Sequence, residues 1–306
     1  MKKAGIIPSK GIGDAIMMMI AANYMKQKGY DVTIYHDNII SLKDWLPSYT
    51  LLPTPGYSNV LKQLDRVIIQ NDNSQIVKDI KTNRHTLNNL HICYPTYRQS
   101  KHGDITSNDI IFDNNRPMVD NVCHKLSNHF NLFPSKDINL AIPDHLIRHK
   151  HKNRVIIHPT STEKNRMWSY KKYIALSRKL RNLGYNPIFC VSPNERKDWL
   201  EVQNMGFDLP LFPTLSDLFS YIYESSYFIG NISGLAHIAS YMKIPSIIVC
   251  GDAKHMKLWQ PGWLLASIIL PNRLLPNIKY LRLREKHWQY FLSVKKVYNK
   301  FCQIVN

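Results

Sequence analysis

The sequence predicts an α/β protein with two doubly wound domains, in which helices cover both faces of a parallel sheet. Three observations support this prediction. The chain has 306 residues, about twice the length of a common domain. Short apolar runs that suit buried strands alternate with segments of helical periodicity. The alternation stops at a polar, basic stretch, 143–153, and then starts again.

In the first half, apolar runs and helical patterns follow one another along the chain. Gly29 stands where a helix C-cap glycine is expected, and Pro117 suits the first turn of a helix. The predicted strands are Lys3–Pro8, Asp31–Tyr35, Arg66–Gln70 and Leu90–Tyr94, and the predicted helices are Asp14–Gln27, Gln75–Lys81 and Pro117–Phe133.

The second half repeats the alternation after the linker Pro143–Asn153. The predicted strands are Arg154–His158, Pro187–Val191, Tyr227–Gly230 and Ser246–Cys250, and the predicted helices are Ser169–Asn182, Asn194–Asn204, Leu215–Glu224 and Gly234–Met242. Apolar residues at spacings of 3–4 make the tail Arg284–Cys302 an amphipathic helix. We expect domains at 1–145 and 153–283, with a terminal helix in 284–306 and a ligand at the carboxyl ends of the strands.

The net charge indicates an anionic partner. The chain has 40 Lys and Arg against 22 Asp and Glu, a formal net charge of +18 and a pI near 9.6. Nucleic acid, an acidic membrane surface and a phosphorylated or carboxylated substrate all fit this charge. The basic stretches that carry it, which are also typical of ordinary solvated surface, are Lys101-His102, Arg148–Lys152, Arg166–Lys172 and Lys295-Lys296.

The composition also limits location and cofactors. No apolar run is long enough for a transmembrane helix. The N-terminus begins with Lys2 and Lys3, but Pro8, Lys10 and Asp14 interrupt the apolar stretch, so a cytoplasmic protein is expected. The five cysteines lie far apart with no CxxC pair, which predicts reduced thiols, no disulfide framework and no metal site.

The first motif, Ser9–Asp14, follows the first predicted strand and opens the first helix. Gly11 and Gly13 allow a tight turn and a close ligand approach, and the helix N-terminus favours anions. The spacing matches neither a dinucleotide fingerprint nor a P-loop. Asp14 is either a capping carboxylate or a general base at a ligand cleft.

Three further motifs follow predicted strands of the second half. His158–Thr162 places hydroxyls where a phosphate would bind, unless it is an ordinary polar loop. In Ser192–Arg196, Glu195 either favours a helix N-terminus or accepts hydrogen bonds from ribose hydroxyls. Gly230–His237 suits a diphosphate cradle at a helix N-terminus, although His237 is also compatible with a structural role.

Taken in order, these motifs resemble those of glycosyltransferase family 9, the ADP-heptose-type lipopolysaccharide heptosyltransferases, over nearly the whole chain. The matching segments are the Gly-x-Gly-Asp turn at Gly11–Asp14, His-Pro-Thr-Ser at His158–Thr162, the basic residue two before Trp168, Glu195-Arg196, Asn231–His237, Gly251, and the Trp-x-Pro of Trp259–Pro261.

The resemblance implies a GT-B fold, with two Rossmann-like domains facing across a cleft and a last helix that crosses back to the N-terminal domain. It implies an inverting, metal-independent transfer of a sugar from a nucleotide diphosphate sugar, with no further cofactor, to an anionic acceptor such as lipopolysaccharide core at the inner membrane surface. Asp14 and Arg166 would be catalytic. The donor-binding residues would be Thr160, Ser161, Thr162, Glu195, Asn231, Ser233, Gly234 and His237, and the acceptor-binding residues Ser9, Lys10, Gly13, Arg98 and Lys101.

Two positions depart from the family pattern. Arg166 replaces the usual lysine, which keeps a positive charge and adds a planar fork suited to phosphate. Ile232 replaces an aspartate of the donor site and removes an acceptor for sugar hydroxyls. Two alternatives stay open: a glycosyltransferase acting on modified bases of DNA, which the net charge of +18 also fits, and a catalytically inert nucleotide-sugar-binding protein, which is suggested by Ile232.

Overall fold

A computed structural model describes residues 1–56, 59–87, 89–271 and 287–305. The chain divides into two compact units, Met1–Asp144 and His145–Asn306, and each is described by itself. The sequence places the first boundary at 145 and a linker up to 153, whereas strand β7 already begins at His151. The predicted boundary at 283 and 284 lies outside the described residues.

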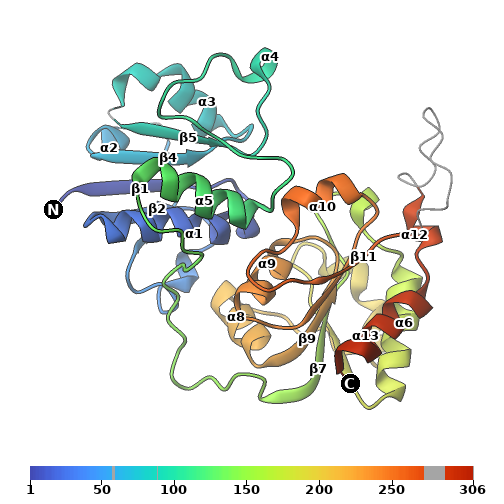
Figure 1. Ribbon diagram of the computed structural model, residues 1–306. Helices are drawn as coiled ribbons and strands as arrows, with labels where there is room; N and C mark the ends of the chain where they lie inside the picture. The colour runs from blue at the N-terminus through green and yellow to red at the C-terminus, as the bar shows by residue number, and fades with distance from the viewer. Residues whose placement is uncertain (57–58, 88, 272–286, 306) are drawn as a thin grey trace. The chain divides into compact units, whose positions relative to one another are not determined.

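The first unit holds a six-stranded parallel sheet in the order β3-β2-β1-β4-β5-β6 (Figure 1). Its strands are β1 (Lys3–Ile7), β2 (Asp31–Tyr35), β3 (Thr50–Leu52), β4 (Arg66–Gln70), β5 (Leu90–Tyr94) and β6 (Ile110–Ile111). Its helices are α1 (Ile12–Gln27), α2 (Asn59–Lys62), α3 (Gln75–Thr82), α4 (Gln99–His102) and α5 (Met118–Phe130), with short 3₁₀ turns at Ile40–Leu42 and Arg84–Thr86.

The strand order places a switch point between β1 and β4. The chain runs from β1 outward to β2 and β3, and then returns to the other side of β1 to form β4. Loops that leave neighbouring strands in opposite directions open a crevice at the carboxyl edge, which is where doubly wound sheets bind ligands.

Successive side chains of a strand point to opposite faces of the sheet, and in the central strand β4 the side chains on both faces are buried against helices. Val67 and Ile69 of β4 face a cluster that includes Leu61 of α2 and Val77 and Ile80 of α3. Helix α1 packs against α5, and Tyr24 of α1 donates a hydrogen bond to the Cys123 carbonyl of α5. A strand buried on both faces needs an almost continuous apolar run, and the burial of β4 shows one.

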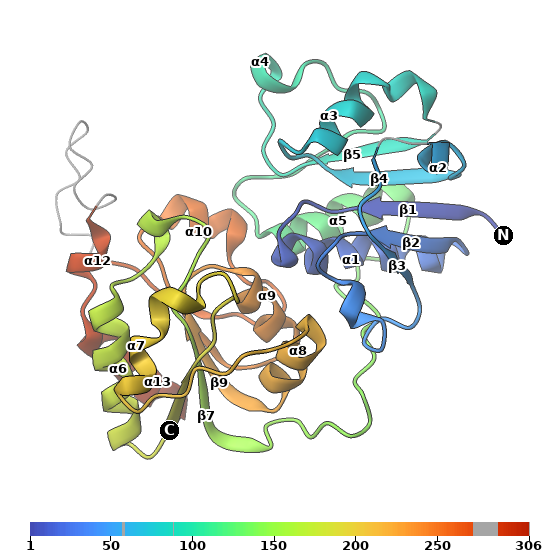
Figure 2. The ribbon, with the colours of Figure 1, turned by 180° about the vertical axis from the view of Figure 1, so that it is seen from behind.

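The second unit holds a five-stranded parallel sheet in the order β11-β10-β9-β7-β8 (Figure 2). Its strands are β7 (His151–His158), β8 (Asn186–Phe189), β9 (Ser225–Gly230), β10 (Ser246–Val249) and β11 (Ser267–Ile269). Its helices are α6 (Tyr170–Asn182), α7 (Glu201–Asn204), α8 (Leu215–Tyr223), α9 (Gly234–Tyr241), α10 (Ala253–Trp259), α12 (Trp288–Phe291) and α13 (Val294–Val305), with 3₁₀ turns at Lys164–Arg166 and Arg196–Trp199. The switch point lies between β7 and β9.

The C-terminal helix α13 belongs to the core of the second unit. Its buried residues, Val297 and Phe301, join the cluster formed by β7, β10 and α6. The expectation that this helix crosses back onto the N-terminal domain is therefore wrong for its buried face. Lys172 of α6 fixes the preceding turn, because its ammonium donates hydrogen bonds to the carbonyls of Gln289, Tyr290 and Leu292.

The predicted fold class, α/β with two parallel sheets, is confirmed. The three short strands β3, β6 and β11 were not predicted, because two- or three-residue edge strands carry too little pattern. The helix predicted at Asn194–Asn204 is instead a 3₁₀ turn followed by the short helix α7. Among the described residues, no helix is long and apolar enough to span a membrane.

Gly251, two residues after β10, has no room for a side chain. A Cβ atom there would overlap the indole ring of Trp288, which is 2% exposed and donates from Nε1 to the Asn165 carbonyl over 2.8 Å. We expect Gly251→Ala to lower the free energy of unfolding by about 1–3 kcal/mol, the usual cost of overpacking. Thermal and urea unfolding measure it.

Gly56→Ala is the matched control, because nothing lies within 4 Å of the Cβ position at Gly56. It should change the free energy of unfolding by less than about 0.5 kcal/mol. Equal stability of the Gly251 and Gly56 variants would contradict the packing described for Trp288.

Candidate active site

Asp14 lies in the first turn of α1, at the carboxyl edge of the first sheet. The helix begins immediately after Gly11, and its N-terminal dipole favours a carboxylate there. A Cβ atom at Gly11 would lie 2.6 Å from Asp14 Oδ2. Gly11 therefore leaves the space that the Asp14 carboxylate occupies, which is the physical reason for glycine in this turn.

Gln70 at the end of β4 and Asp72 just after it influence the charge state of Asp14. The Gln70 amide donates a hydrogen bond to Asp14 Oδ1, and Asp72 places a second carboxylate nearby. Burial raises the pKa of Asp14 to about 6, with a smaller contribution from Asp72, while the Gln70 hydrogen bond opposes the increase. A carboxyl group with this pKa is ionised at pH 7 and still basic enough to accept a proton.

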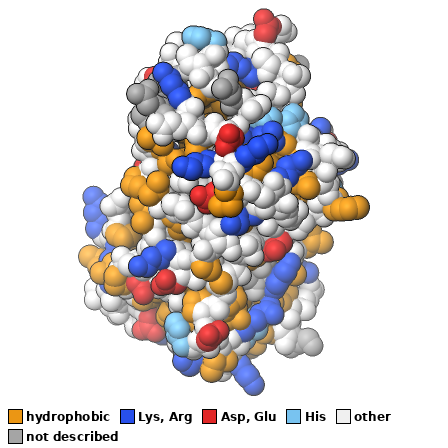
Figure 3. All heavy atoms as spheres, turned by 90° about the vertical axis from the view of Figure 1, so that its left-hand side faces the viewer, with side chains coloured by type: hydrophobic (Ala, Val, Ile, Leu, Met, Phe, Trp, Pro, Cys, Tyr) orange, Lys and Arg blue, Asp and Glu red, His pale blue; other side chains and the backbone are white. Residues whose placement is uncertain are grey.

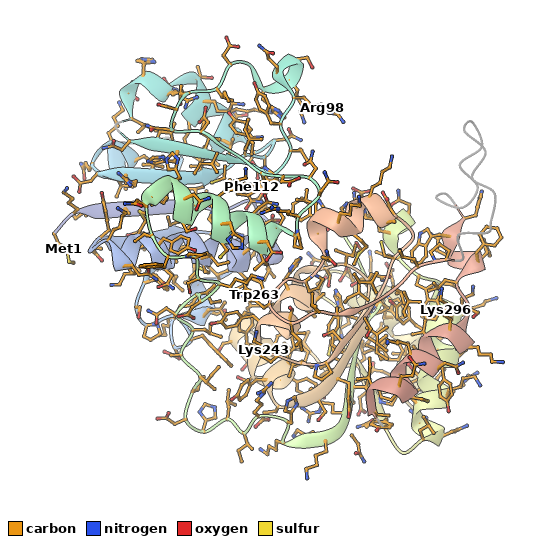
Figure 4. All side chains as sticks on the ribbon, viewed as in Figure 1. Met1, Arg98, Phe112, Lys243, Trp263 and Lys296 are labelled. Atoms are coloured by element: carbon orange, nitrogen blue, oxygen red, sulfur yellow. The ribbon has the colours of Figure 1, made fainter. Side chains whose placement is uncertain are left out.

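The residues predicted to bind an acceptor are spread over the first unit. The Ser9 hydroxyl donates to Asp72 Oδ2 over 2.7 Å, and Lys10 is exposed beside it. Gly13 is buried in the first turn of α1. Arg98 and Lys101 are exposed on the loop that carries α4, and Figure 4 shows Arg98 on this loop. The hydrogen bonds thus place Ser9 in the Asp14 network and show no link from Arg98 or Lys101 to it.

In the second unit, the loops after β7 and β8 meet through Glu195. Glu195 Oε2 accepts hydrogen bonds from the Thr160 hydroxyl (3.1 Å) and from the backbone and hydroxyl of Ser192 (3.0 and 2.6 Å). One carboxylate oxygen thus ties the two loops together. Glu195 Oε1 has no hydrogen-bond partner within the described residues and is the oxygen available to a ligand. Thr162 is exposed.

Asn231 has a structural role in the second unit, and its predicted role in donor binding stays a prediction. The side chain is fully buried, its Nδ2 donates to the Pro159 carbonyl (2.6 Å), and its Oδ1 accepts from the Trp168 backbone (3.0 Å). These bonds hold the loop after β7 against the end of β9. Ser161 adds a long hydrogen bond of 3.4 Å to the Ile232 carbonyl.

The N-terminus of α9 is formed by Ser233 and Gly234. Ser233 is the N-cap, and its hydroxyl accepts a hydrogen bond from the Ala236 backbone. His237 is 3% exposed, burial lowers its pKa to about 4, and its Nδ1 has no hydrogen-bond partner in the described part of the chain. Because the His237 ring is neutral, it offers no positive charge to an anionic ligand at the start of α9, and it could bind such a ligand only by donating a hydrogen bond.

Arg166 lines a pocket of about 360 Å³ in the second unit. Its guanidinium pairs with Glu163 over 2.9 Å and stays partly exposed. Ile232 lines the same pocket, so the two positions at which the sequence departs from its family pattern lie together. The lining residues that the sequence did not predict are Glu163, Asn165, Val249, Cys250, Asp252, His255 and Trp288.

These unpredicted residues come from three places. Glu163 and Asn165 follow β7, and Cys250 and Asp252 follow β10, so the rule that ligands bind after strands would have found them. Trp288 comes from the C-terminal tail, where its apolar spacing indicated only a packing role. Thr160, Glu195 and His237 do not line this pocket. They lie on the segments that follow β7, β8 and β9, respectively.

The basic excess belongs mainly to the second unit. Residues 145–306 contain 24 Lys and Arg against 9 Asp and Glu, whereas residues 1–144 contain 16 against 13. On the face shown in Figure 3, the Lys and Arg side chains are scattered among acidic ones. The net charge therefore favours an anion at the second unit more than at the first.

A family model, glycosyltransferase family 9 (heptosyltransferase), matches residues 114–273. The chain belongs to glycosyltransferase family 9. The match spans β7 to β11, and so it includes the loops with Thr160, Arg166, Glu195 and the α9 N-terminus. The recognition made from the motifs is confirmed, and this family 9 protein is a glycosyltransferase.

Solved structures show the same fold over nearly the whole chain. A glycosyl transferase family 9 protein from Veillonella parvula matches with a TM-score of 0.71 and 13% identity, covering 97% of this chain and 95% of its own. The E. coli heptosyltransferase WaaC with ADP matches with a TM-score of 0.71 and 12% identity, covering 98% of this chain and 99% of its own. E. coli ADP-heptose lipopolysaccharide heptosyltransferase II gives 0.70 and 13%, covering 98% of each. A search of curated proteins by sequence found no match.

These matches confirm the GT-B fold class of this glycosyltransferase. In the described residues, no group of three or more His, Cys, Asp or Glu side chains is arranged to hold a metal ion. Metal independence itself stays a prediction.

Proposed function

We propose that this protein transfers a sugar from a nucleotide diphosphate sugar to a glycan acceptor, with inversion at the anomeric carbon and without a metal ion. The observation that carries the proposal is Asp14, a partly buried carboxylate at the switch point of the first sheet. Its pKa of about 6 suits a general base near neutral pH.

In the proposed step, an acceptor hydroxyl attacks the anomeric carbon of the donor. Asp14 takes the hydroxyl proton while the new C–O bond forms, and the bond to the diphosphate oxygen breaks with its electron pair on the diphosphate. Attack opposite the leaving group inverts the anomeric centre. General-base assistance of this kind contributes about 10²–10⁴-fold in rate.

The second unit supplies groups that suit the leaving diphosphate. Arg166 offers a positive planar fork, and the first turn of α9 offers backbone N–H groups, which in any helix lack partners within the helix itself. Both favour the charge that grows as the bond breaks. An ADP-linked donor is supported by the similar E. coli protein WaaC, whose structures hold ADP and ADP-2-deoxy-2-fluoro heptose.

We further propose a lipopolysaccharide core sugar as the acceptor. The support is the similarity to a lipopolysaccharide heptosyltransferase. The net charge of +18 was the reason to expect an anionic acceptor, with DNA as the alternative. Most of this charge lies in the second unit, where it suits the donor diphosphate. The charge therefore gives no separate support for DNA.

A donor screen tests the proposal. The protein is incubated with a panel of ADP-, GDP-, UDP- and CMP-linked sugars, and thermal stability and release of the nucleotide are recorded with and without lipopolysaccharide core oligosaccharide. A true donor raises the unfolding temperature, because it binds the native state. Acceptor-dependent release of ADP is the expected result. Release from no donor, by a folded protein, would refute the proposal.

The pH dependence of turnover should follow the pKa of Asp14. We expect kcat/KM to fall below about pH 6, because protonated Asp14 cannot accept the acceptor proton. Gln70→Leu removes the hydrogen bond that lowers this pKa, so the acid limb should move to higher pH. Asp72→Asn removes a like charge, so the limb should move to lower pH. Parallel shifts in both variants would contradict the assignment.

A further inference from the structure

A second pocket lies in the first unit, beside the Asp14 network. It measures about 190 Å³ and is lined by residues that follow four neighbouring strands, β3, β2, β1 and β4. Its polar residues include Lys10, His36, Asp37, Thr54 and Asp72. Pockets for drug-sized ligands measure about 300–1,000 Å³. This pocket therefore has room for one small ring and not for an extended chain.

The pocket is connected to Asp14 by hydrogen bonds. The Ser9 hydroxyl donates to Asp72, and the Ser9 backbone donates to Gln70 Oε1 over 3.4 Å. Gln70 in turn donates to Asp14. A group held in this pocket would therefore contact Asp72, which hydrogen bonds through Ser9 and Gln70 connect to the carboxylate that the proposed function uses as its base.

His36 is a buried polar group without a full set of partners. It is 2% exposed, and its Nδ1 accepts a hydrogen bond from the Asn38 backbone. Its Nε2 is buried and has no hydrogen-bond partner among the described residues. Burial lowers the pKa of His36, while the backbone of Lys10 and Ser9 and the charge of Asp37 oppose the decrease, so the ring is neutral at pH 7. A ligand hydroxyl that reached Nε2 would supply the missing hydrogen-bond partner.

The other polar groups suit a ligand that both donates and accepts. Asp37 Oδ1 accepts from the Thr54 backbone over 2.9 Å, while its second oxygen has no partner in the described part of the chain. Pro8 and Ile76 add apolar walls. Sugar rings present hydroxyls that donate and accept, together with apolar C–H faces, and they match this mixture.

The charge of the pocket argues against an anion. Two carboxylates, Asp37 and Asp72, line it, and Lys10 is the one cation among its described lining residues. Asp14 adds a third carboxylate through the shared network. A phosphate or carboxylate placed here would face this negative charge, whereas an uncharged ring would not.

We infer that this pocket binds one uncharged sugar ring of the acceptor. The role as acceptor pocket rests on the proposed function, and the class of ligand rests on His36, Asp37 and Asp72. The inference limits the range of possible acceptors. The sugar ring bound in this pocket carries neither phosphate nor carboxylate, although other parts of the same glycan can carry them.

The test compares a neutral ring with its own acid. The full chain is titrated with methyl glycosides of glucose, galactose, mannose and a heptose, and with methyl glucuronide, and binding is followed by ligand-observed NMR. At least one neutral glycoside should bind ten times more tightly than the glucuronide. Asp37→Ala should weaken that binding at least tenfold. The control Asp44→Ala, which removes an exposed carboxylate outside the pocket, should change it less than twofold.

Titration of the same sample with ADP separates this inference from the proposed function. Binding of ADP without any neutral glycoside would overturn the inference and leave the proposed function intact. Equal binding of the glucuronide, or glycoside binding that survives Asp37→Ala, would also overturn it. Glycoside binding by a protein that releases nucleotide from no donor would refute the proposed function, while the ligand class of the pocket would stand.

Discussion

Replacing Asp14 with asparagine is expected to lower kcat by about 10²–10⁴-fold, the usual contribution of a general base. The amide keeps the size of the side chain and its place in the first turn of α1, but it cannot accept the proton of the acceptor hydroxyl. Because the groups proposed to bind the donor lie in the second unit, we expect affinity for the nucleotide to stay the same. Steady-state kinetics with a donor identified in the screen measures both quantities.

Asp44→Asn is the control for this substitution, because it removes an exposed carboxylate of the same unit. It should leave kcat unchanged. A folded Asp14→Asn variant that turns over at the rate of the unmodified protein would remove Asp14 from the role of base, whatever its pKa.

Arg166→Ala is expected to lower kcat by about 10²–10³-fold, comparable to the loss of one preorganised donor to a developing oxyanion. The guanidinium lies in the 360 Å³ pocket and remains partly exposed although it pairs with Glu163. Its removal should weaken the transition state more than the ground state, so kcat should fall more than donor affinity. Arg166→Lys keeps the charge and loses the planar fork, and it should have an intermediate rate.

Arg178→Ala provides the matched control, since Arg178 is an exposed arginine on α6 of the same unit. Its kinetics should equal those of the unmodified protein. If Arg166→Ala changed only the KM for the acceptor, the assignment of Arg166 to the leaving diphosphate would be wrong.

The alternation of apolar runs and helical periods was sufficient to predict the fold class. Strands β2, β4 and β5 lie at the predicted residues, because β4 and β5 are buried along almost their whole length, and buried residues alternate with half-buried ones at the start of β2. The place of the C-terminal helix was not predictable in this way. An amphipathic pattern shows that one face is buried but not what buries it, and Val297 and Phe301 pack on the second sheet.

The chemistry-bearing residues were predictable where they follow strands, and their roles were predictable only in part. Asp14 and Arg166 were identified from motif order, and their catalytic roles remain to be tested. Asn231 belongs to the same motif, yet both of its amide groups are bonded to the backbone of the loop after β7. Sequence spacing places a side chain at an edge of the sheet, but only packing decides whether its polar atoms are already used.

The sequence alone thus determined two doubly wound domains, the family, and the loops that carry the site, because these depend on patterns local to each segment. The tertiary structure decided the rest. It joined Gln70 and Asp72 to Asp14, collected His36, Asp37 and Thr54 from separate loops into one pocket, and set Trp288 against Gly251. Burial, charge and hydrogen bonding between segments far apart in the chain produce these features, and no local pattern records them.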